Sequence, residues 1–171
     1  TCKSRILNGQ SKGNRTVLGC DDPGAWSLRS RVIGDCWGFS TSPNPAFDNG
    51  CYLSDEWITI RKNSVEDVVV RKSDINIPGQ HNVLNVLAAC ALAGAADVEV
   101  AAMRQAIREF EGLPHRIELV RENMGVRWIN DSVATAPERT LAAISSFSDP
   151  IVLLLGGRDK HLPWGKLAKV V

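Results

Sequence analysis

The chain has 171 residues, 44% of them hydrophobic, and a formal net charge of +1 from 20 basic and 19 acidic side chains. This balance gives no electrostatic reason to expect nucleic acid or an anionic membrane as a partner, and no apolar run reaches the roughly 18 residues of a membrane span. The hydrophobic content is sufficient for a packed core, so disorder is not expected.

The cysteines are widely spaced, odd in number and without any C-x-x-C pair. They are Cys2, Cys20, Cys36, Cys51 and Cys90. This pattern argues against a zinc site and against a disulfide framework. We expect reduced thiols, mostly as small core residues, in a protein of the cytoplasm.

The first seventy or so residues predict a small, mostly β region. The apolar run at 17–20 fits a buried strand, and Asp21-Asp22-Pro23 directly after it is a common helix start. Further short strands are expected at 31–39, 51–53, 56–61 and 65–70, with Ser, Pro, Asn and Gly between them.

A helical period replaces the strand pattern after this region. Apolar residues in 79–96 form a broad helical face, which is expected to end at Gly94. Asp97 then offers an N-cap for a second helix. The apolar stripe of that helix consists of Val100, Met103, Ile107 and Phe110. We place a domain boundary at 112–114, where a Gly and a Pro follow the second helix.

The last third of the chain predicts strands and a helix in an α/β arrangement. Strands at 117–120 and 126–129 flank a Gly-containing loop and indicate a hairpin. A helix is expected from about 137 to 147. The continuous apolar run 151–155 fits a buried parallel strand.

Polar clusters stand at the ends of these predicted elements. The first is Gln80-His81-Asn82 with Asn85, because side-chain amides at a helix N-terminus can hold a nucleotide base or a phosphate. The alternative is ordinary capping of the helix by Asn82, with Asn85 merely exposed. The second cluster is Leu113 to Arg116. The guanidinium of Arg116 could bind a phosphate or a ribose hydroxyl. A surface ion pair of Arg116 with Glu118 or Glu122 is the alternative.

The third cluster surrounds Asp131, which lies just past the carboxyl end of a predicted strand, where α/β sheets bind ligands. Thr135-x-x-Glu138 is a capping-box pattern with Pro137 in the first turn. We therefore expect Thr135 to start the following helix. This explains the turn without function, but it does not explain Asp131.

The fourth cluster is Gly156-Gly157-Arg158-Asp159-Lys160. Glycines after a buried strand let the backbone approach a ligand closely. The segment is not a P-loop, because the pattern G-x-x-x-x-G-K-[ST] does not occur in the chain. Alternatively, Asp159 and Lys160 form a loop ion pair of little energetic weight.

Taken in order, HN-x-x-N, GLPHR, WINDS-x-AT and LLLGG-x-DK resemble the Mur ligases, most strongly between Gly79 and Lys160. The resemblance implies an α/β chain. Residues 1–112 would be the end of a central ATP-binding domain, a small β region plus two helices, and residues 113–171 part of a Rossmann-like C-terminal domain. The P-loop and a UDP-binding domain would precede residue 1, so the 171 residues alone are expected to be inactive.

The NDS-x-AT form favours the branch of the family that adds D-glutamate. The resemblance then implies ATP-driven amide formation with Mg²⁺, in peptidoglycan precursor synthesis. The carboxylate of UDP-N-acetylmuramoyl-L-alanine would become an acyl phosphate, which the D-glutamate amine attacks. The alternatives are another Mur or folylpolyglutamate-type amide ligase and a nucleotide-binding module without chemistry.

The resemblance also implies roles for particular residues. Those implied to contact ATP are Asn82 and Asn85 at the adenine, and Arg116 and Asp131 at the ribose and phosphates. Those implied on the substrate side are His81, Thr135 and Lys160, the last two facing the carboxylates of D-glutamate.

Lys3 opens a segment, Lys3 to Leu7, that resembles the family stretch whose lysine is carbamylated. Carbon dioxide would convert this cation into an anion with oxygen donors suited to Mg²⁺; a solvated surface lysine is the alternative. Lys3 and Lys160 are the implied catalytic residues. The chain departs from the family at Val133, where a lysine is usual, and at Gly19-Cys20, where an asparagine usually precedes Asp-Asp.

Overall fold

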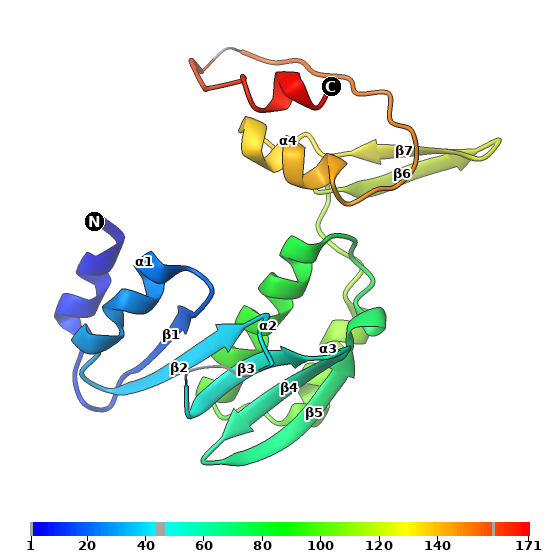
Figure 1. Cartoon of the computed structure of the whole chain (residues 1–171). Helices are drawn as coiled ribbons and strands as arrows, with labels where there is room; N and C mark the ends of the chain where they lie inside the picture. Colours follow the sequence, from blue (N-terminus) through cyan, green and yellow to red (C-terminus); the bar gives the residue numbers. More distant parts are fainter. Residues whose placement is uncertain (1, 44–46, 159) are drawn as a thin grey trace. The chain divides into compact units, whose positions relative to one another are not determined.

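The computed structural model describes residues 2–43, 47–158 and 160–171 (Figure 1). Side chains are described from Ser4 onward. These residues form two compact units. The first unit comprises Thr1–Asn76 and Asn82–Phe110, and the second unit comprises Ile77–His81 and Glu111–Val171. That these units correspond to the central and C-terminal domains of a Mur ligase, divided at residue 112, stays a prediction.

A five-stranded sheet of order β1-β2-β3-β4-β5 forms the base of the first unit. The strands are β1 (Arg15–Gly19), β2 (Asp35–Ser40), β3 (Asn49–Ser54), β4 (Trp57–Lys62) and β5 (Val65–Arg71). The first three run parallel, and β3, β4 and β5 are joined as antiparallel hairpins. The predicted strands are thus all present, although β2 begins only at Asp35, because a 3₁₀ helix occupies Ser27–Arg31.

Short helices complete the beginning of the first unit. A 3₁₀ helix spans Cys2–Gly9, and α1 spans Pro23–Trp26. The helix start predicted at Asp21-Asp22-Pro23 is confirmed, since the Asp22 carboxylate accepts a hydrogen bond of 3.0 Å from the Ala25 amide. A third short helix, Lys72–Asp74, follows β5.

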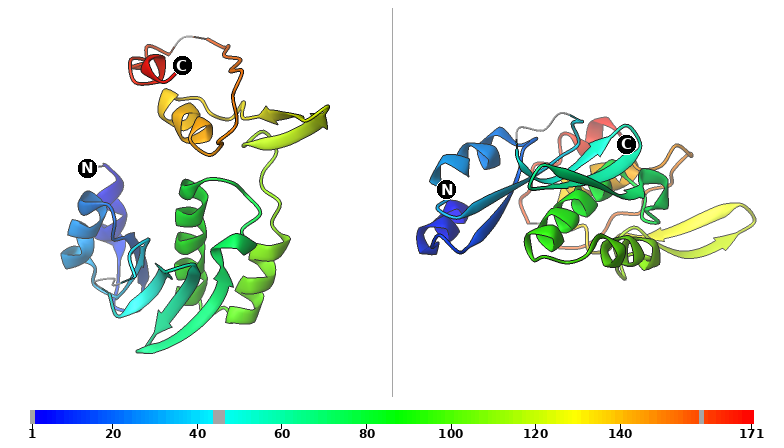
Figure 2. Two further views of the ribbon diagram at one scale, coloured as in Figure 1. Left: turned by 45° about the vertical axis from the view of Figure 1, so that its right-hand side comes forward. Right: turned by 90° about the horizontal axis from the view of Figure 1, so that it is seen from below.

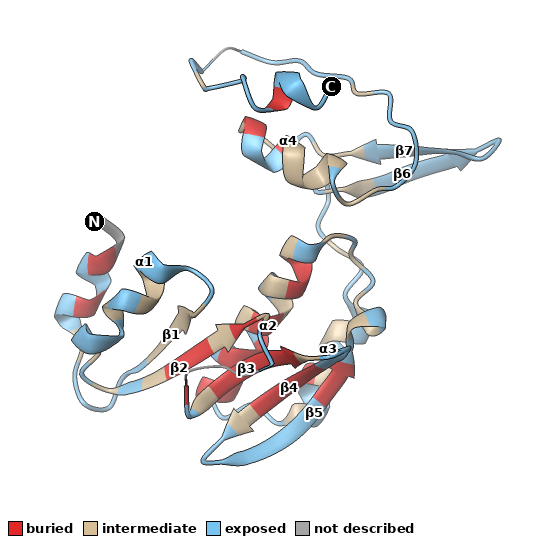
Figure 3. Cartoon of the chain, in the orientation of Figure 1, coloured by how far each residue is buried: buried red, intermediate tan, exposed pale blue. Residues whose placement is uncertain are grey.

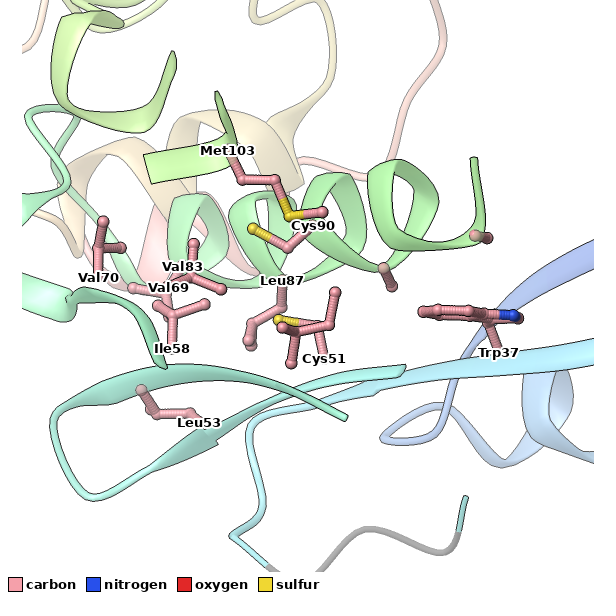
Figure 4. Packing of buried hydrophobic residues seen from close by; sticks show 13 residues of the cluster. Trp37, Cys51, Leu53, Ile58, Val69, Val70, Val83, Leu87, Cys90 and Met103 are labelled. Carbon is pink, nitrogen blue, oxygen red and sulfur yellow. The ribbon is translucent and has the colours of Figure 1, made fainter. Parts of the chain in front are cut away.

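Helices α2 (Gln80–Ala95) and α3 (Val100–Glu109) pack on one face of the sheet (Figure 2). Their apolar faces meet the strands in one buried cluster (Figure 4). The helical members are Val83, Leu87, Cys90, Ala91, Ala95 and Met103; the strand members are Trp37, Cys51, Leu53, Ile58, Ile60, Val69 and Val70. Cys51 and Cys90 are hydrogen-bonded thiols within this core, and the described cysteines are free.

Two details of the helix ends differ from the prediction. Gly94 does not end α2 but lies buried inside it, where an added Cβ would be 2.8 Å from Trp37 and 2.5 Å from Ile60. Asp97 does not cap α3, whose N-cap is Glu99. Instead, the Asp97 amide bonds back to Gly94 at the end of α2, and its carboxylate pairs at 2.5 Å with both Arg15 and Lys62.

The second unit contains the predicted hairpin, β6 (Glu118–Asn123) with β7 (Val126–Asn130). Met124 and Gly125 form its turn, both with positive φ, as a two-residue hairpin loop requires. Helix α4 (Pro137–Ile144) lies against the 3₁₀ helix Leu167–Lys169. Buried residues are dense in the sheet and α2 of the first unit, whereas the hairpin is largely exposed (Figure 3). Among the described residues, no helix is long and apolar enough to cross a membrane.

Two predictions for the second unit are wrong. Residues 151–155 do not form a buried strand: Val152 is 90% exposed, and the run pairs with no strand of the described chain. Apolar character alone cannot make a strand without a neighbouring edge that supplies hydrogen bonds. Thr135 does not start α4, whose N-cap is Ala136. Pro137 excludes a helical backbone at the residue before it, so Ala136 is extended and Thr135 lies one position outside the helix.

Candidate functional site

A polar cluster in the second unit brings together three of the motifs identified in the sequence. His81 ends the segment 77–81, and Gly79 before it adopts φ +102 so close to the residues that follow α4 that a Cβ would lie 2.4 Å from Ser146 Oγ. The pKa of His81 is lowered, first by burial and then by the positive charge of Arg116, while Asp131 opposes the shift. His81 therefore lies within the electrostatic reach of Arg116 and of Asp131.

Three successive backbone amides around Arg116 donate hydrogen bonds that hold this part of the chain. The His115 amide donates to Glu118 Oε2 at 2.7 Å, and the Arg116 amide donates to the Leu113 carbonyl at 3.2 Å. The Ile117 amide donates to Asp131 Oδ1 at 3.2 Å. We call residues 113–117 the arginine turn. Hydrogen bonds at three successive amides thus hold the backbone of this turn.

Two residues of the arginine turn have unusual backbone conformations. His115 has φ 64 and Ile117 has φ 49, in the left-handed region. This region is disfavoured for residues with a Cβ and most of all for β-branched ones such as isoleucine. Conformations of this kind persist only where the surroundings hold them, and they concentrate at ligand-binding sites.

The residues after β7 are tied to the same turn. Asn130 Nδ2 donates to His115 Nδ1 at 2.8 Å, and the Val133 amide donates to the His115 carbonyl at 3.2 Å. Asn130 Oδ1 also accepts from the Ser132 amide at 3.1 Å, which turns the chain away from the strand. GLPHR and WINDS therefore form one structural element, with Asp131 contributing a structural hydrogen bond as well as its charge.

Arg116 itself is exposed, and among the described residues no ion pair joins it to Glu118 or Glu122. The carboxylate of Glu118 faces His115 instead, with 3.7 Å between Oε2 and Nδ1. The surface ion pair considered as an alternative is thus absent from the described part of the chain. The guanidinium remains available to an anion.

The asparagines lie in the first unit, in the first turns of α2. Asn82 is buried, and its Oδ1 accepts from Asn85 Nδ2 at 3.1 Å. Asn82 lies two residues after the start of α2 at Gln80, and Asn85 is exposed, as the alternative without a ligand predicts for it. The contact orients the two amides relative to each other.

The remaining predicted site residues are Thr135, Lys160 and Lys3. Thr135 and Lys160 are exposed, and Gly157 adopts φ +129 in open surroundings. Asp159 and the side chain of Lys3 lie outside the described residues. Within the described chain, no group of three or more His, Cys, Asp or Glu side chains could hold a metal ion.

Glu118 and Asn130 are the members of the cluster that the sequence did not single out. Glu118 was considered only as a partner of Arg116, and Asn130 only as part of a motif. The spacing of Glu118, three residues after His115, is the signal that could have revealed its contact with the His115 amide.

Solved structures that are similar to this chain show what its fold is. MurF from Acinetobacter baumannii matches 84% of the chain and 31% of its own, with a TM-score of 0.66 and 18% identity. A pseudomurein peptide ligase type C from Methanothermus fervidus matches 87% of the chain and 36% of its own, with a TM-score of 0.61 and 17% identity. The fold is that of the Mur-type peptide ligases, and the predicted α/β class is confirmed.

Sequence relatives of this chain carry the name of one Mur ligase. The chain is 37% identical over 169 residues to the UDP-N-acetylmuramoylalanine--D-glutamate ligase of Pelotomaculum thermopropionicum, and 38% identical over 172 residues to the ligase of the same name from Acetivibrio thermocellus. It spans 37% and 36% of their lengths. No protein-family model matches it. The chain is therefore a homologue of the Mur ligases, and the relationship predicted from its motifs is confirmed.

Proposed function

We propose that the protein is an ATP-dependent ligase that adds D-glutamate to UDP-N-acetylmuramoyl-L-alanine through an acyl phosphate, in peptidoglycan precursor synthesis. The observation that carries this proposal is the polar cluster of His81, Arg116 and Asp131, in a chain 36–38% identical to ligases named for D-glutamate. The cluster combines an exposed guanidinium with a carboxylate, groups suited to phosphate and ribose respectively.

In this proposal the protein mainly positions the reactants and neutralises charge, as in other phosphoryl transfers. Arg116 would bind phosphate oxygens of ATP, and Asp131 would accept hydrogen bonds from ribose hydroxyls through the oxygen that Ile117 does not use. Asn82 and Asn85 would contact the adenine side. His81 would lie on the substrate side of the same cluster.

The described residues of this chain do not themselves form a Mg²⁺ site. The assignment of a carbamylated Lys3 as a magnesium ligand therefore stays a proposal. In the complete enzyme, Lys3→Ala should abolish most activity, and short-chain carboxylates should restore part of it by replacing the carbamate oxygens. Full activity of Lys3→Ala without additives would exclude this role.

Thr135 and Lys160 are proposed to receive the carboxylates of D-glutamate. Each carboxylate needs a donor or a cation in a partly dry site, and Val133 cannot supply a charge. Lys160→Ala should therefore raise the KM for D-glutamate well above any change for ATP, while Val133→Lys should leave it equal or lower it. Small, equal effects of Lys160→Ala on both KM values would return this lysine to a surface role.

The decisive test of the function is a phosphate-release assay on the complete enzyme with ATP and UDP-N-acetylmuramoyl-L-alanine. D-glutamate should support turnover, and L-glutamate and L-lysine should not. Turnover with another amino acid in preference to D-glutamate would indicate a different amide ligase. ATP binding without turnover for any amino acid would indicate a nucleotide-binding module.

A further inference from the structure

We infer that Glu118 is a positioning residue, which holds the arginine turn so that Arg116 faces ATP. The inference rests on the proposed function and adds to it a residue that does not itself contact the nucleotide. It stands on the hydrogen bonds of the turn and on its backbone conformation.

The carboxylate of Glu118 contacts two elements through a single oxygen. Oε2 accepts from the His115 amide at 2.7 Å, lies 3.7 Å from His115 Nδ1, and accepts from Asn130 Nδ2 at 3.4 Å. One side chain at the start of β6 therefore touches both the arginine turn and the end of β7. Since the Asn130 side chain also bonds to the His115 ring, each of the three residues is linked to the other two, with Glu118 joined to His115 through the backbone amide.

Two carboxylates accept the hydrogen bonds that hold the arginine turn. Asp131 holds the amide of Ile117, and Glu118 holds the amide of His115, on either side of Arg116. Both held residues are in the left-handed region, which they do not prefer. Without its acceptor, His115 would relax towards an ordinary conformation and change the direction of Arg116.

Asp131 cannot test this idea cleanly, because the same carboxylate is proposed to contact the ribose. Among the residues that the structure describes, the Glu118 carboxylate contacts only the arginine turn and Asn130, so a change at Glu118 tests the support of the turn without removing a proposed ribose contact. Glu122 provides a matched control: it is the same residue type, four positions further along the same strand, and exposed.

The test uses the complete enzyme with four variants: Glu118→Ala, Glu118→Asp, Glu118→Gln and Glu122→Ala. Loss of a hydrogen bond to a charged group predicts a rise of about tenfold in the KM for ATP for Glu118→Ala. Glu118→Asp should act in the same direction, because the shorter side chain withdraws the acceptor. Glu118→Gln should restore most of the affinity, because its amide oxygen can still accept from His115, and Glu122→Ala should match the parent.

The KM for D-glutamate should stay within about twofold of the parent in the Glu118 variants. Calorimetric titration with a non-hydrolysable ATP analogue gives the same comparison without turnover, so failure of the proposed reaction and failure of this inference are distinguishable. If Glu118→Ala does not fold, Glu118→Asp decides. An unchanged affinity for ATP, an equal rise in both KM values, or a Glu118→Gln variant as weak as Glu118→Ala would overturn the inference.

Discussion

Different interactions stabilise the interior of each of the two units. In the first unit, α2 and α3 close over the sheet, and side chains such as Ile58 and Leu87 have no exposed surface. In the second unit, many large apolar side chains face solvent, among them Trp128 and Leu154. There the arginine turn is determined by carboxylates that accept from backbone amides. The comparison teaches that the scaffold depends on packing, whereas the candidate site depends on a few polar contacts.

The largest expected effect is on the core of the first unit. Leu87→Ala should lower the free energy of unfolding by about 2–5 kcal/mol, because a fully buried leucine leaves a cavity. Leu92→Ala is the control, since Leu92 lies on the same helix but is 58% exposed and should change stability by less than about 0.5 kcal/mol. Urea unfolding measures both, and equal losses would contradict the described packing of α2.

A gain of about 1 kcal/mol is expected at the start of α4 in the second unit. Ala136 is the N-cap but has no side-chain acceptor, so Ala136→Asp should satisfy a free helix amide and protect α4 amides from hydrogen exchange. Thr135→Ala should leave this protection unchanged. A loss of protection in Thr135→Ala would show instead that Thr135 caps the helix.

A smaller, pH-dependent effect is expected at Asp21, after β1. Burial raises the pKa of its carboxyl, but hydrogen bonds from Ser40 and Thr41 lower it further, so the pKa lies below its ordinary value of 3.8. A carboxyl with a lowered folded-state pKa contributes stability above pH 3.8, which is lost as the pH falls through the folded-state pKa.

Asp21→Asn should therefore be less stable than the parent at neutral pH, and the difference should shrink in acid. Ser40→Ala, which removes one donor, should show a weaker form of the same behaviour. Thermal unfolding followed from pH 7 downwards would reveal it. Parallel curves for the parent and Asp21→Asn would mean that these hydrogen bonds do not lower the pKa.

The smallest effect is expected in the run 151–155. Val152→Ser in the 171-residue chain should change the free energy of unfolding by less than about 0.5 kcal/mol, since the side chain is 90% exposed. The comparison between the units would weaken if this substitution cost as much as Leu87→Ala, because Val152 would then be a core residue.

Secondary-structure elements that depend on the local sequence pattern were predictable. Features that depend on contacts with residues far away in the sequence were not. The strands, the hairpin and α2 followed from periodicity and turn residues. Gly94 was taken for a helix end because its reason, the closeness of Trp37 and Ile60, comes from other strands. The run 151–155 was taken for a strand because a sequence does not show whether an edge is present to pair with it.

The candidate site was predictable to a similar degree. The motifs indicated His81, Arg116 and Asp131, which the second unit brings together. They did not indicate that Glu118 and Asp131 bond to backbone amides, because such contacts depend on unusual φ values at His115 and Ile117. No composition or spacing rule predicts these values for residues that avoid them.

The thiols of the first unit have a consequence for chemical labelling. Cys51 and Cys90 are buried in the core, and the pKa of Cys20 is raised to about 11, chiefly by burial, so that this thiol stays protonated at neutral pH. Alkylating reagents react with thiolates, so we expect Cys20, Cys51 and Cys90 to be alkylated slowly. Met124, 95% exposed at the tip of the hairpin, could be replaced (Met124→Cys) to give a fast-reacting position for a fluorophore or spin label. The hairpin could then be followed spectroscopically, with the native cysteines of the core left in place.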